Sequence, residues 1–381
     1  MISYSNPTWD IFCKVVDNFG DAGVCWRLAR QLVDERGQSV RLWCDDLAAL
    51  ARLCPQADPA QATQRIAGVE IRLWSDPFPV ALPAQVVIEA FACELPAGYV
   101  AAMATRTPPP VWINLEYLSA EQWIEDCHRR ASPHPRLPLL KHFFFPGFTT
   151  ETGGLIREER LLERRAAFQG DCAAGWAALG LPTPQAGEIS VSLFCYDNPA
   201  LPALVETWQQ GAKPVRCFVR QGRILDQLAA VMGEELRPGS VHRRGRLTIH
   251  ALPFVPQKDF DALLWACDIN FVRGEDSFVR AQWAARPLIW HIYPQDDDAH
   301  RLKLAAFLDR YCEDMPARPA MVCREFWNQW NRGAAADWGS LWEQRKALDT
   351  HAGRWAQRLA TQKDLATSLA EFVEARLKSF V

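Results

Sequence analysis

A segment at residues 17–23, with the sequence DNFGDAG, joins a predicted strand to a predicted helix. In open α/β sheets, such strand-to-helix turns carry the residues that bind ligands. Asp17 and Asp21 stand where a pyrophosphate would meet the helix N-terminus, and because like charges repel, we expect this loop to bind a cation. Asp is also a common helix N-cap and turn residue, which is the structural alternative. The candidate residues of this loop are Asp17, Asn18, Phe19, Gly20, Asp21 and Gly23.

A second strand-to-helix loop, with the sequence RGEDSF, begins at Arg273 and suits an anion. Gly274 lets a ligand approach the backbone, Arg273 supplies positive charge, and the N–H groups of the following helix point toward a bound anion. Ser277 or Asp276 is the expected cap of that helix. The loop therefore predicts a site for a nucleoside diphosphate.

Two acidic features have both a functional and a structural interpretation. Glu275 does not suit a phosphate site, so it either pairs with Arg273 or faces a partly cationic sugar in a transition state. The run 296–298 (DDD) has the residue type of a metal site, but acidic residues also favour the first turn of a helix, which is the interpretation we prefer. The histidines show no paired ligand spacing, so we expect no metal and no cofactor.

Aromatic and amide side chains follow the predicted strands of the second half of the chain at comparable positions. At one edge of a sheet, such groups would stack on a base and form hydrogen bonds with it, although each ring taken singly is also a normal core residue. The candidates are Phe194, Tyr196, Phe254, Gln257, Phe260 and Tyr293.

Short apolar runs alternate with amphipathic segments, a pattern typical of βαβ units and a mainly parallel sheet. We predict strands at 9–16, 39–44, 69–74, 85–90 and 110–115, and a second series at 189–194, 214–219, 246–252, 268–272 and 287–290. The Pro-rich and Phe-rich stretch from about 128 to 150 is expected to be irregular. From about 297 the chain should be helical, with breaks near Pro316 and Gly353.

The chain has 381 residues, which predicts two domains at roughly 100 to 200 residues each. We place an N-terminal Rossmann-like domain at 1–184 and a C-terminal one at 185–360, with a final helix at 361–381 crossing back to the first. Lys and Arg number 42 against 45 Asp and Glu, a net charge of −3 that gives no attraction to nucleic acid or anionic membranes.

The cysteines and the apolar runs indicate a cellular compartment. The 12 cysteines form no C-x-x-C pair and mostly lie in apolar runs, which predicts free thiols in a reducing, cytoplasmic environment. The sequence has neither a signal-peptide pattern nor an apolar run of about 18 residues, so we expect neither secretion nor a membrane span.

Four longer motifs closely resemble the EarP family, the protein-arginine rhamnosyltransferases that modify translation elongation factor P. They are VVDNFGDAGVCWRLARQL at 15–32, INLEYLS at 113–119, KHFFFPGFTTETGGL at 141–155, and NFVRGEDSFVRAQWA at 270–284 followed by PLIWHIYPQ. The resemblance implies a GT-B glycosyltransferase with two Rossmann-like domains facing a central cleft. It further implies dTDP-β-L-rhamnose as the donor, elongation factor P as the acceptor protein, and an α-rhamnosyl arginine formed with inversion.

Carried over residue by residue, the resemblance implies that Asp21 is the catalytic base, that Asp17 supports it and that Glu275 acts in the transition state. It implies that Arg273, Asp276 and Ser277 bind the diphosphate and sugar. The dTDP pocket would be lined by Phe194, Tyr196, Phe254, Gln257, Phe260 and Tyr293.

Three other functions remain open from the residues themselves. A GT-B transferase with another nucleotide sugar or acceptor would use the same loops. A non-catalytic nucleotide-binding partner of a translation factor would not need the three carboxylates Asp17, Asp21 and Glu275. A nicotinamide-dependent dehydrogenase is disfavoured because the G-x-G-x-x-G fingerprint is absent.

Overall fold

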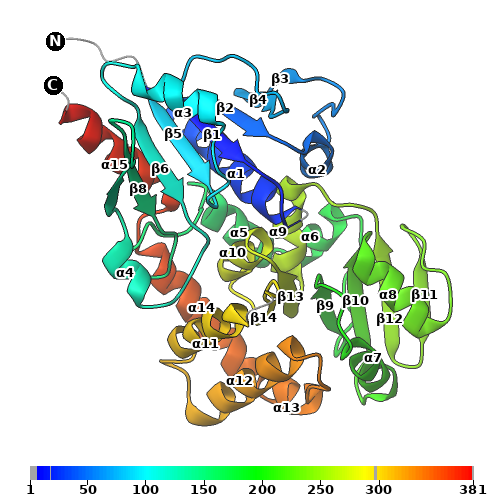
Figure 1. The fold of residues 1–381 in the computed structure, drawn as a ribbon. Coiled ribbons are helices and arrows are strands. Elements are labelled where there is room, and N and C mark those ends of the chain that lie inside the picture. The colour runs from blue at the N-terminus through cyan, green and yellow to red at the C-terminus, as the bar shows by residue number, and fades with distance from the viewer. Residues whose placement is uncertain (1–6, 18, 296–297, 380–381) are drawn as a thin grey trace. The chain divides into compact units, whose positions relative to one another are not determined.

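The computed structural model describes residues 7–17, 19–295 and 298–379, with only the backbone at Lys258. The chain forms two compact units, one of Met1–Glu159 together with Leu359–Val381 and one of Arg160–Arg358. Each unit contains a mainly parallel sheet with helices packed on it (Figure 1). Each is therefore an α/β unit of the Rossmann type expected from the sequence.

The first unit has a sheet of eight strands in its described part, in the order β3-β4-β2-β1-β5-β6-β8-β7. The edge strands β3 and β7 run antiparallel to their neighbours. The strands are β1 (Thr8–Cys13), β2 (Ser39–Cys44), β3 (Thr63–Ile66), β4 (Val69–Leu73), β5 (Val86–Ala90), β6 (Val111–Leu115), β7 (Ala131–Pro133) and β8 (Leu140–Phe144). The helices are α1 (Gly20–Arg36), α2 (Leu47–Leu53), α3 (Ala97–Ala104), α4 (Trp123–Cys127) and α15 (Leu365–Lys378).

Strand β1 ends at Cys13, earlier than the predicted end at residue 16, for a reason visible in its hydrogen bonds. The N–H groups of Val15 and Val16 donate to the carboxylates of Asp45 and Asp21, at 2.9 and 2.8 Å. These donors are therefore not available to the sheet. The chain leaves β1 as a loop held by side chains and then enters α1.

The prediction of an irregular segment from 128 to 150 was wrong for part of that stretch. Leu140–Phe144 forms β8, which pairs in parallel with β6 and antiparallel with β7. Prolines flank this strand on both sides and mask its short buried alternation in the sequence.

The second unit has a sheet of six strands in its described part, in the order β11-β12-β10-β9-β13-β14. The strands are β9 (Ile189–Leu193), β10 (Val215–Arg220), β11 (Val241–Arg244), β12 (Leu247–Leu252), β13 (Ile269–Arg273) and β14 (Leu288–His291). The helices are α5 (Leu161–Gly170), α6 (Cys172–Ala178), α7 (Leu201–Gln210), α8 (Arg223–Met232), α9 (Gln257–Ala266), α10 (Asp276–Ala284), α11 (Ala299–Tyr311), α12 (Ala317–Asn331), α13 (Trp338–Glu343) and α14 (Arg345–Ala360).

The second unit begins at Arg160 rather than at the predicted residue 185. Helices α5 and α6 precede the second sheet in the sequence but pack on α9, and α5 also packs on α10. Arg165 Nη1 donates to the backbone oxygen of Trp283 at 2.8 Å, and Gln169 Nε2 donates to that of Ala284 at 3.1 Å. These contacts tie both helices to the second unit.

The helical tail behaves as predicted at one break and differently at the other. Pro316 is the N-cap of α12, which confirms the break there. Helix α14 runs through Gly353, because one glycine costs a helix only about 1 kcal/mol. The tail breaks instead before Asp364, whose side chain caps α15 by accepting from Thr367 N at 3.0 Å.

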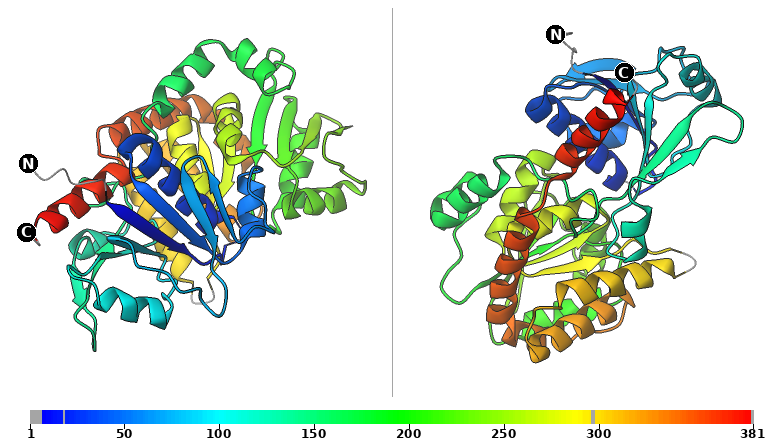
Figure 2. Two further views of the ribbon diagram at one scale, coloured as in Figure 1. Left: turned by 90° about the horizontal axis from the view of Figure 1, so that it is seen from above. Right: turned by 90° about the vertical axis from the view of Figure 1, so that its left-hand side faces the viewer.

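Helix α15 packs on α1 and β6, so the C-terminal helix does return to the first unit (Figures 1 and 2). Gln31 Nε2 in α1 donates to Asp364 Oδ1 at 3.0 Å and to the backbone oxygen of Arg157 at 2.8 Å. The predicted crossing back of the tail is confirmed by these contacts.

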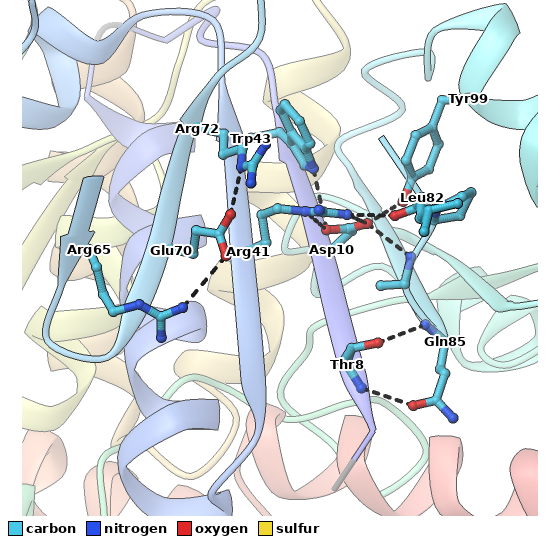
Figure 3. Close-up of polar contacts among 12 residues, drawn as sticks. Thr8, Asp10, Arg41, Trp43, Arg65, Glu70, Arg72, Leu82, Gln85 and Tyr99 are labelled. Atoms are coloured by element: carbon cyan, nitrogen blue, oxygen red, sulfur yellow. Dashed lines mark hydrogen bonds and ion pairs between the residues drawn. The ribbon is translucent and has the colours of Figure 1, made fainter. Parts of the chain in front are cut away.

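A buried ion pair holds the centre of the first sheet (Figure 3). Asp10 in β1 is fully buried, and Arg41 in β2 donates to its two carboxylate oxygens at 2.5 and 2.6 Å. Trp43 Nε1, the backbone N–H of Ala84 and the Tyr99 hydroxyl donate to the same carboxylate. Because so many donors face it, this charge is compensated inside the protein.

Candidate functional site

The loop between β1 and α1 is held together by Asp21. This residue lies in the first turn of α1, is 2% exposed, and its Oδ2 accepts from the backbone N–H groups of Val16 and Asp17 at 2.8 and 2.9 Å. The N-cap is Phe19, whose side chain makes no capping hydrogen bond. The structural alternative of Asp21 as an N-cap is therefore wrong, and Asp21 instead ties the loop back onto the helix.

The same loop brings the second carboxylate, Asp17, against the helix start. The N–H of Gly20 donates to the backbone oxygen of Asp17 at 2.6 Å, and a Cβ at Gly20 would lie 2.8 Å from Asp17 Oδ2. Only glycine fits this approach without a shift. Gly23 N–H donates to the Phe19 oxygen at 2.8 Å, whereas Asn18 lies outside the described residues. The predicted residues of this loop that are described thus lie together.

Buried thiols lie beneath this acidic loop. Cys13 and Cys25 are both fully buried, and their hydrogen bond raises the pKa of the Cys13 thiol well above its ordinary value. Burial raises the pKa of Cys93 to about 12. These thiols are neutral near pH 7, so they pack as small apolar side chains and provide no thiolate nucleophile.

The loop between β13 and α10 is built by a different side chain in a similar position. Ser277, in the first turn of α10, accepts from the backbone N–H of Arg273 at 3.0 Å and donates to its carbonyl oxygen at 2.5 Å. Gly274 has a φ of 57°, and its carbonyl accepts from Trp290 Nε1 at 2.8 Å. Neither Ser277 nor Asp276 is the N-cap, because that position is occupied by Glu275, whose side chain makes no capping bond.

The remaining predicted residues gather at the carboxyl ends of the parallel strands of the second sheet. The Arg273 guanidinium carbon lies 4.6 Å from the ring centroid of Phe194 and 4.7 Å from that of Tyr196. The Tyr196 ring in turn meets Tyr293 edge-on at 5.6 Å. Tyr293 is 41% exposed, so one face of this aromatic group is open to solvent.

Helix α9 provides a second part of this edge. Gln257 Nε2 donates to Asp276 Oδ2 at 3.1 Å, which links α9 to the start of α10. Phe260 is 3% exposed and meets Phe194 edge-on at 6.0 Å, so its ring contacts protein on most sides. Phe254, after β12, is half-buried.

Arg220, which was not predicted from the sequence, also lies at this edge. Arg220 ends β10, is 8% exposed, and its guanidinium carbon lies 4.1 Å from the centroid of Phe194, 4.0 Å from Phe260 and 5.8 Å from Phe254. The predicted strand ended at residue 219, just before it. The rule that selected Arg273, a charged residue at the carboxyl end of a parallel strand, applies equally to Arg220.

The described residues contain neither a cluster of metal-binding side chains nor a membrane-spanning helix. Within residues 7–17, 19–295 and 298–379, no group of three or more His, Cys, Asp or Glu is arranged to hold a metal ion. Of the run 296–298, Asp296 and Asp297 lie outside these ranges, and Asp298 pairs with Arg301 at 3.2 Å at the start of α11. Among the described helices, none is long and apolar enough to cross a membrane.

The sequence is similar over nearly its whole length to proteins of one family. The family model described as Elongation-Factor P (EF-P) rhamnosyltransferase EarP matches residues 9–374. A protein-arginine rhamnosyltransferase of Pseudomonas aeruginosa is 50% identical over 371 residues, which cover 96% of this chain and 98% of that protein. One of Shewanella oneidensis is 43% identical over 398 residues, covering 98% and 100%.

Solved structures agree with this assignment. A structure described as the basis for EarP-mediated arginine glycosylation of translation elongation factor EF-P matches with a TM-score of 0.66 and 36% identity, covering 97% of this chain and 99% of that one. MurG of Acinetobacter baumannii matches with a TM-score of 0.50 at 14% identity, which supports the fold alone. The expected GT-B fold is confirmed by these likenesses. The chain therefore belongs to the EarP family of elongation factor P rhamnosyltransferases and is an enzyme of the protein-arginine rhamnosyltransferase class.

Proposed function

We propose that this enzyme transfers L-rhamnose from dTDP-β-L-rhamnose to an arginine side chain of translation elongation factor P, with inversion at the anomeric carbon. The observation that carries the proposal is the loop between β1 and α1, which holds two acidic residues, Asp17 and Asp21, and in which the Asp21 carboxylate accepts from the backbone N–H of Asp17. The full-length likeness to protein-arginine rhamnosyltransferases supports it.

The acidic loop suits an arginine acceptor. A guanidinium has a pKa above 12 and is a poor nucleophile while protonated, so its proton must leave as the new bond forms. Two carboxylates can hold the guanidinium in fork geometry and keep one nitrogen aligned with the sugar. Asp21 is fixed by the N–H groups of Val16 and Asp17, so its position is set before the acceptor arrives.

The loop between β13 and α10 suits the nucleotide sugar. Arg273 supplies positive charge, and the α10 N-terminus adds the partial charge of its N–H groups, which together stabilise a diphosphate. Phe194, Tyr196, Phe254 and Tyr293 offer rings to the base, with Gln257 and Phe260 supporting them from α9. Glu275 is the N-cap of α10, and in this proposal its carboxylate faces the developing positive charge of the sugar.

The chemical step balances without a metal. An arginine nitrogen forms a bond to the anomeric carbon while the bond from that carbon to the dTDP oxygen breaks, and dTDP leaves with the electron pair. The nitrogen proton passes to the Asp21 carboxylate. Arg273 and the helix N-terminus stabilise the departing diphosphate, a role that a divalent cation performs in other enzymes.

The cytoplasm is the compartment that fits this reaction. Its acceptor is a translation factor, and each of the 12 cysteines lies in the described part of the chain as a free thiol. The net charge of −3 favours neither nucleic acid nor membrane partners.

Intact-mass analysis of elongation factor P, after incubation with this enzyme and dTDP-β-L-rhamnose, tests the proposal. We expect the mass of one deoxyhexose to be added, on an arginine residue. Parallel reactions with UDP-glucose and GDP-mannose identify the donor. No mass change with any donor would overturn the proposed activity, and a change only with another donor would overturn the choice of sugar.

A further inference from the structure

Arg220 is a buried cation with one buried nitrogen that has no hydrogen-bond partner among the described residues. It is 8% exposed, and its Nε is buried without a hydrogen-bond partner among the described residues. Its near neighbours are the rings of Phe194, Phe260 and Phe254. Ring faces attract a cation, but they offer no oxygen to accept the N–H groups of a guanidinium.

Two other arginines, one fully buried and one partly buried, bind carboxylates of this chain. Arg280, 1% exposed, donates from Nε and Nη2 to the two oxygens of Asp261, at 2.7 and 2.5 Å. Arg41 binds Asp10 in the same bidentate way, from Nε and Nη2. By contrast, Arg220 Nε has no hydrogen-bond partner among the described residues, although Asp276 contributes a negative charge nearby. This buried nitrogen is therefore available to an anion from outside the chain.

Arg220 has one charged neighbour of each sign, Arg273 and Asp276. Burial and the charge of Arg273 lower the pKa of Arg220, while Asp276 acts in the opposite direction. Burial followed by Arg273 lowers the pKa of His291 to about 4, so this imidazole is neutral near pH 7. The lowered pKa of Arg220, about 9, still leaves its guanidinium protonated near pH 7. Two guanidinium groups, Arg220 and Arg273, therefore share this edge.

We propose that Arg220 is a donor-binding residue that hydrogen-bonds the diphosphate of the nucleotide sugar, together with Arg273. Both guanidinium carbons lie near the ring of Phe194, at 4.1 and 4.6 Å from its centroid. A nucleotide sugar carries one negative charge on each phosphate, which matches the two cations. Arginine also suits phosphate geometrically, because its donors form a planar fork. This inference rests on the proposed use of a nucleotide-sugar donor.

Calorimetric titration of dTDP and of thymidine into the full-length enzyme tests the role of Arg220. For Arg220→Met we expect dTDP affinity to fall about 10- to 100-fold, as for loss of a charged hydrogen-bonding group, with thymidine affinity unchanged. Arg220→Lys keeps the charge without the fork, so its loss for dTDP should be smaller. If Arg220→Met does not fold, Arg220→Lys still tests the proposal. We then expect this variant to lose dTDP affinity while its thymidine affinity stays unchanged.

Arg216 provides a matched control on the same strand. It is 4% exposed and lies 5.1 Å from the ring centroids of both Trp176 and Phe218, but near the amino end of β10. Arg216→Met should leave dTDP affinity unchanged.

Two outcomes would overturn the proposal. One is unchanged dTDP affinity in both Arg220 variants. The other is an equal loss for dTDP and thymidine, which would mean that Arg220 only positions the rings. If wild-type enzyme binds another nucleoside diphosphate instead of dTDP, the proposed donor is wrong, and the same comparison is made with that nucleotide and its nucleoside.

Discussion

The loops after β1 and after β13 are held in the same way, but by side chains of different charge. In each, a side chain in the first turn of the helix reaches back to the preceding loop: Asp21 to the N–H groups of Val16 and Asp17, and Ser277 to the backbone of Arg273. We call these two residues, Asp21 and Ser277, the tethers of their loops. The aspartate tether adds a negative charge at the helix start, whereas the serine tether adds none.

This difference determines which ligand each loop suits. The carboxylates of the first loop offset the positive end of the α1 dipole and favour a cation such as arginine. The hydroxyl of the second loop leaves the α10 N-terminus and Arg273 available to an anion. Both helix starts carry acidic residues, since Glu275 is the N-cap of α10 and Asp276 lies in its first turn. The two loops therefore differ in the residue that ties the loop to the helix and in the cation Arg273 that precedes α10.

The largest predicted effect is the loss of transfer rate when the negative charge of Asp21 is removed. Asp21→Asn keeps an oxygen that accepts the two loop N–H groups, so the loop should persist while the base is lost. We expect the transfer rate to fall by about 10³-fold, within the range for general-base catalysis. Single-turnover kinetics with elongation factor P as acceptor measures it.

Asp45→Asn is the matched control for this substitution. Asp45 Oδ1 accepts from Val15 N in the same loop at 2.9 Å but has no proposed role in proton transfer. Its transfer rate should stay close to that of wild type. A rate for Asp21→Asn that equals this control would remove Asp21 as the base.

The second prediction concerns Glu275, the acidic exception in the cationic loop. Glu275→Gln keeps the size of the side chain but removes its charge from the reacting sugar. We expect kcat to fall about 10²-fold with little change in KM, the pattern of a group that acts in the transition state. Steady-state kinetics over a range of donor concentrations checks it, and a change in KM alone would make Glu275 a binding residue.

A smaller effect, on dTDP affinity, is expected when the hydroxyl of Ser277 is removed. Ser277→Ala removes two hydroxyl bonds to the Arg273 backbone, each worth about 1 kcal/mol, so dTDP affinity should fall by at most about 30-fold. Calorimetry measures this loss. Ser340→Ala serves as the control, because the hydroxyl of Ser340 in α13 donates to Asp337, the N-cap of that helix. Equal affinities in the two variants would show that the Ser277 tether does not shape the donor loop.

The smallest effect should come from metal removal. Because Arg273 and the α10 N-terminus are proposed to stabilise the leaving diphosphate, a chelator should leave the transfer rate unchanged. Rates before and after treatment with EDTA, with and without added Mg²⁺, provide the check. Activity that disappears with EDTA and returns with Mg²⁺ would contradict the proposed metal-free step.

Much of the fold could be predicted because buried parallel strands appear as continuous apolar runs. The segment at 39–44 coincides with β2, and those at 189–194 and 268–272 lie within a residue or so of β9 and β13. β8 was missed because it lies among prolines and gains its partners only when it pairs with β6 and β7.

The candidate residues could be selected by their strand-end positions, but their partners could not. Nothing in the sequence tells whether Asp21 caps its helix or ties the loop, because that depends on where the N–H groups of residues 16 and 17 point. Arg220 was missed for a related reason. Its burial among Phe194, Phe254 and Phe260 arises from strand order, which brings residues distant in sequence to one edge.

Calorimetric titration of dTDP into wild type, Asp21→Asn and Arg273→Met tests the division between the two loops most directly. We predict unchanged dTDP affinity for Asp21→Asn and a loss of about 10- to 100-fold for Arg273→Met. A similar loss of dTDP affinity in both variants would contradict separate acceptor and donor loops.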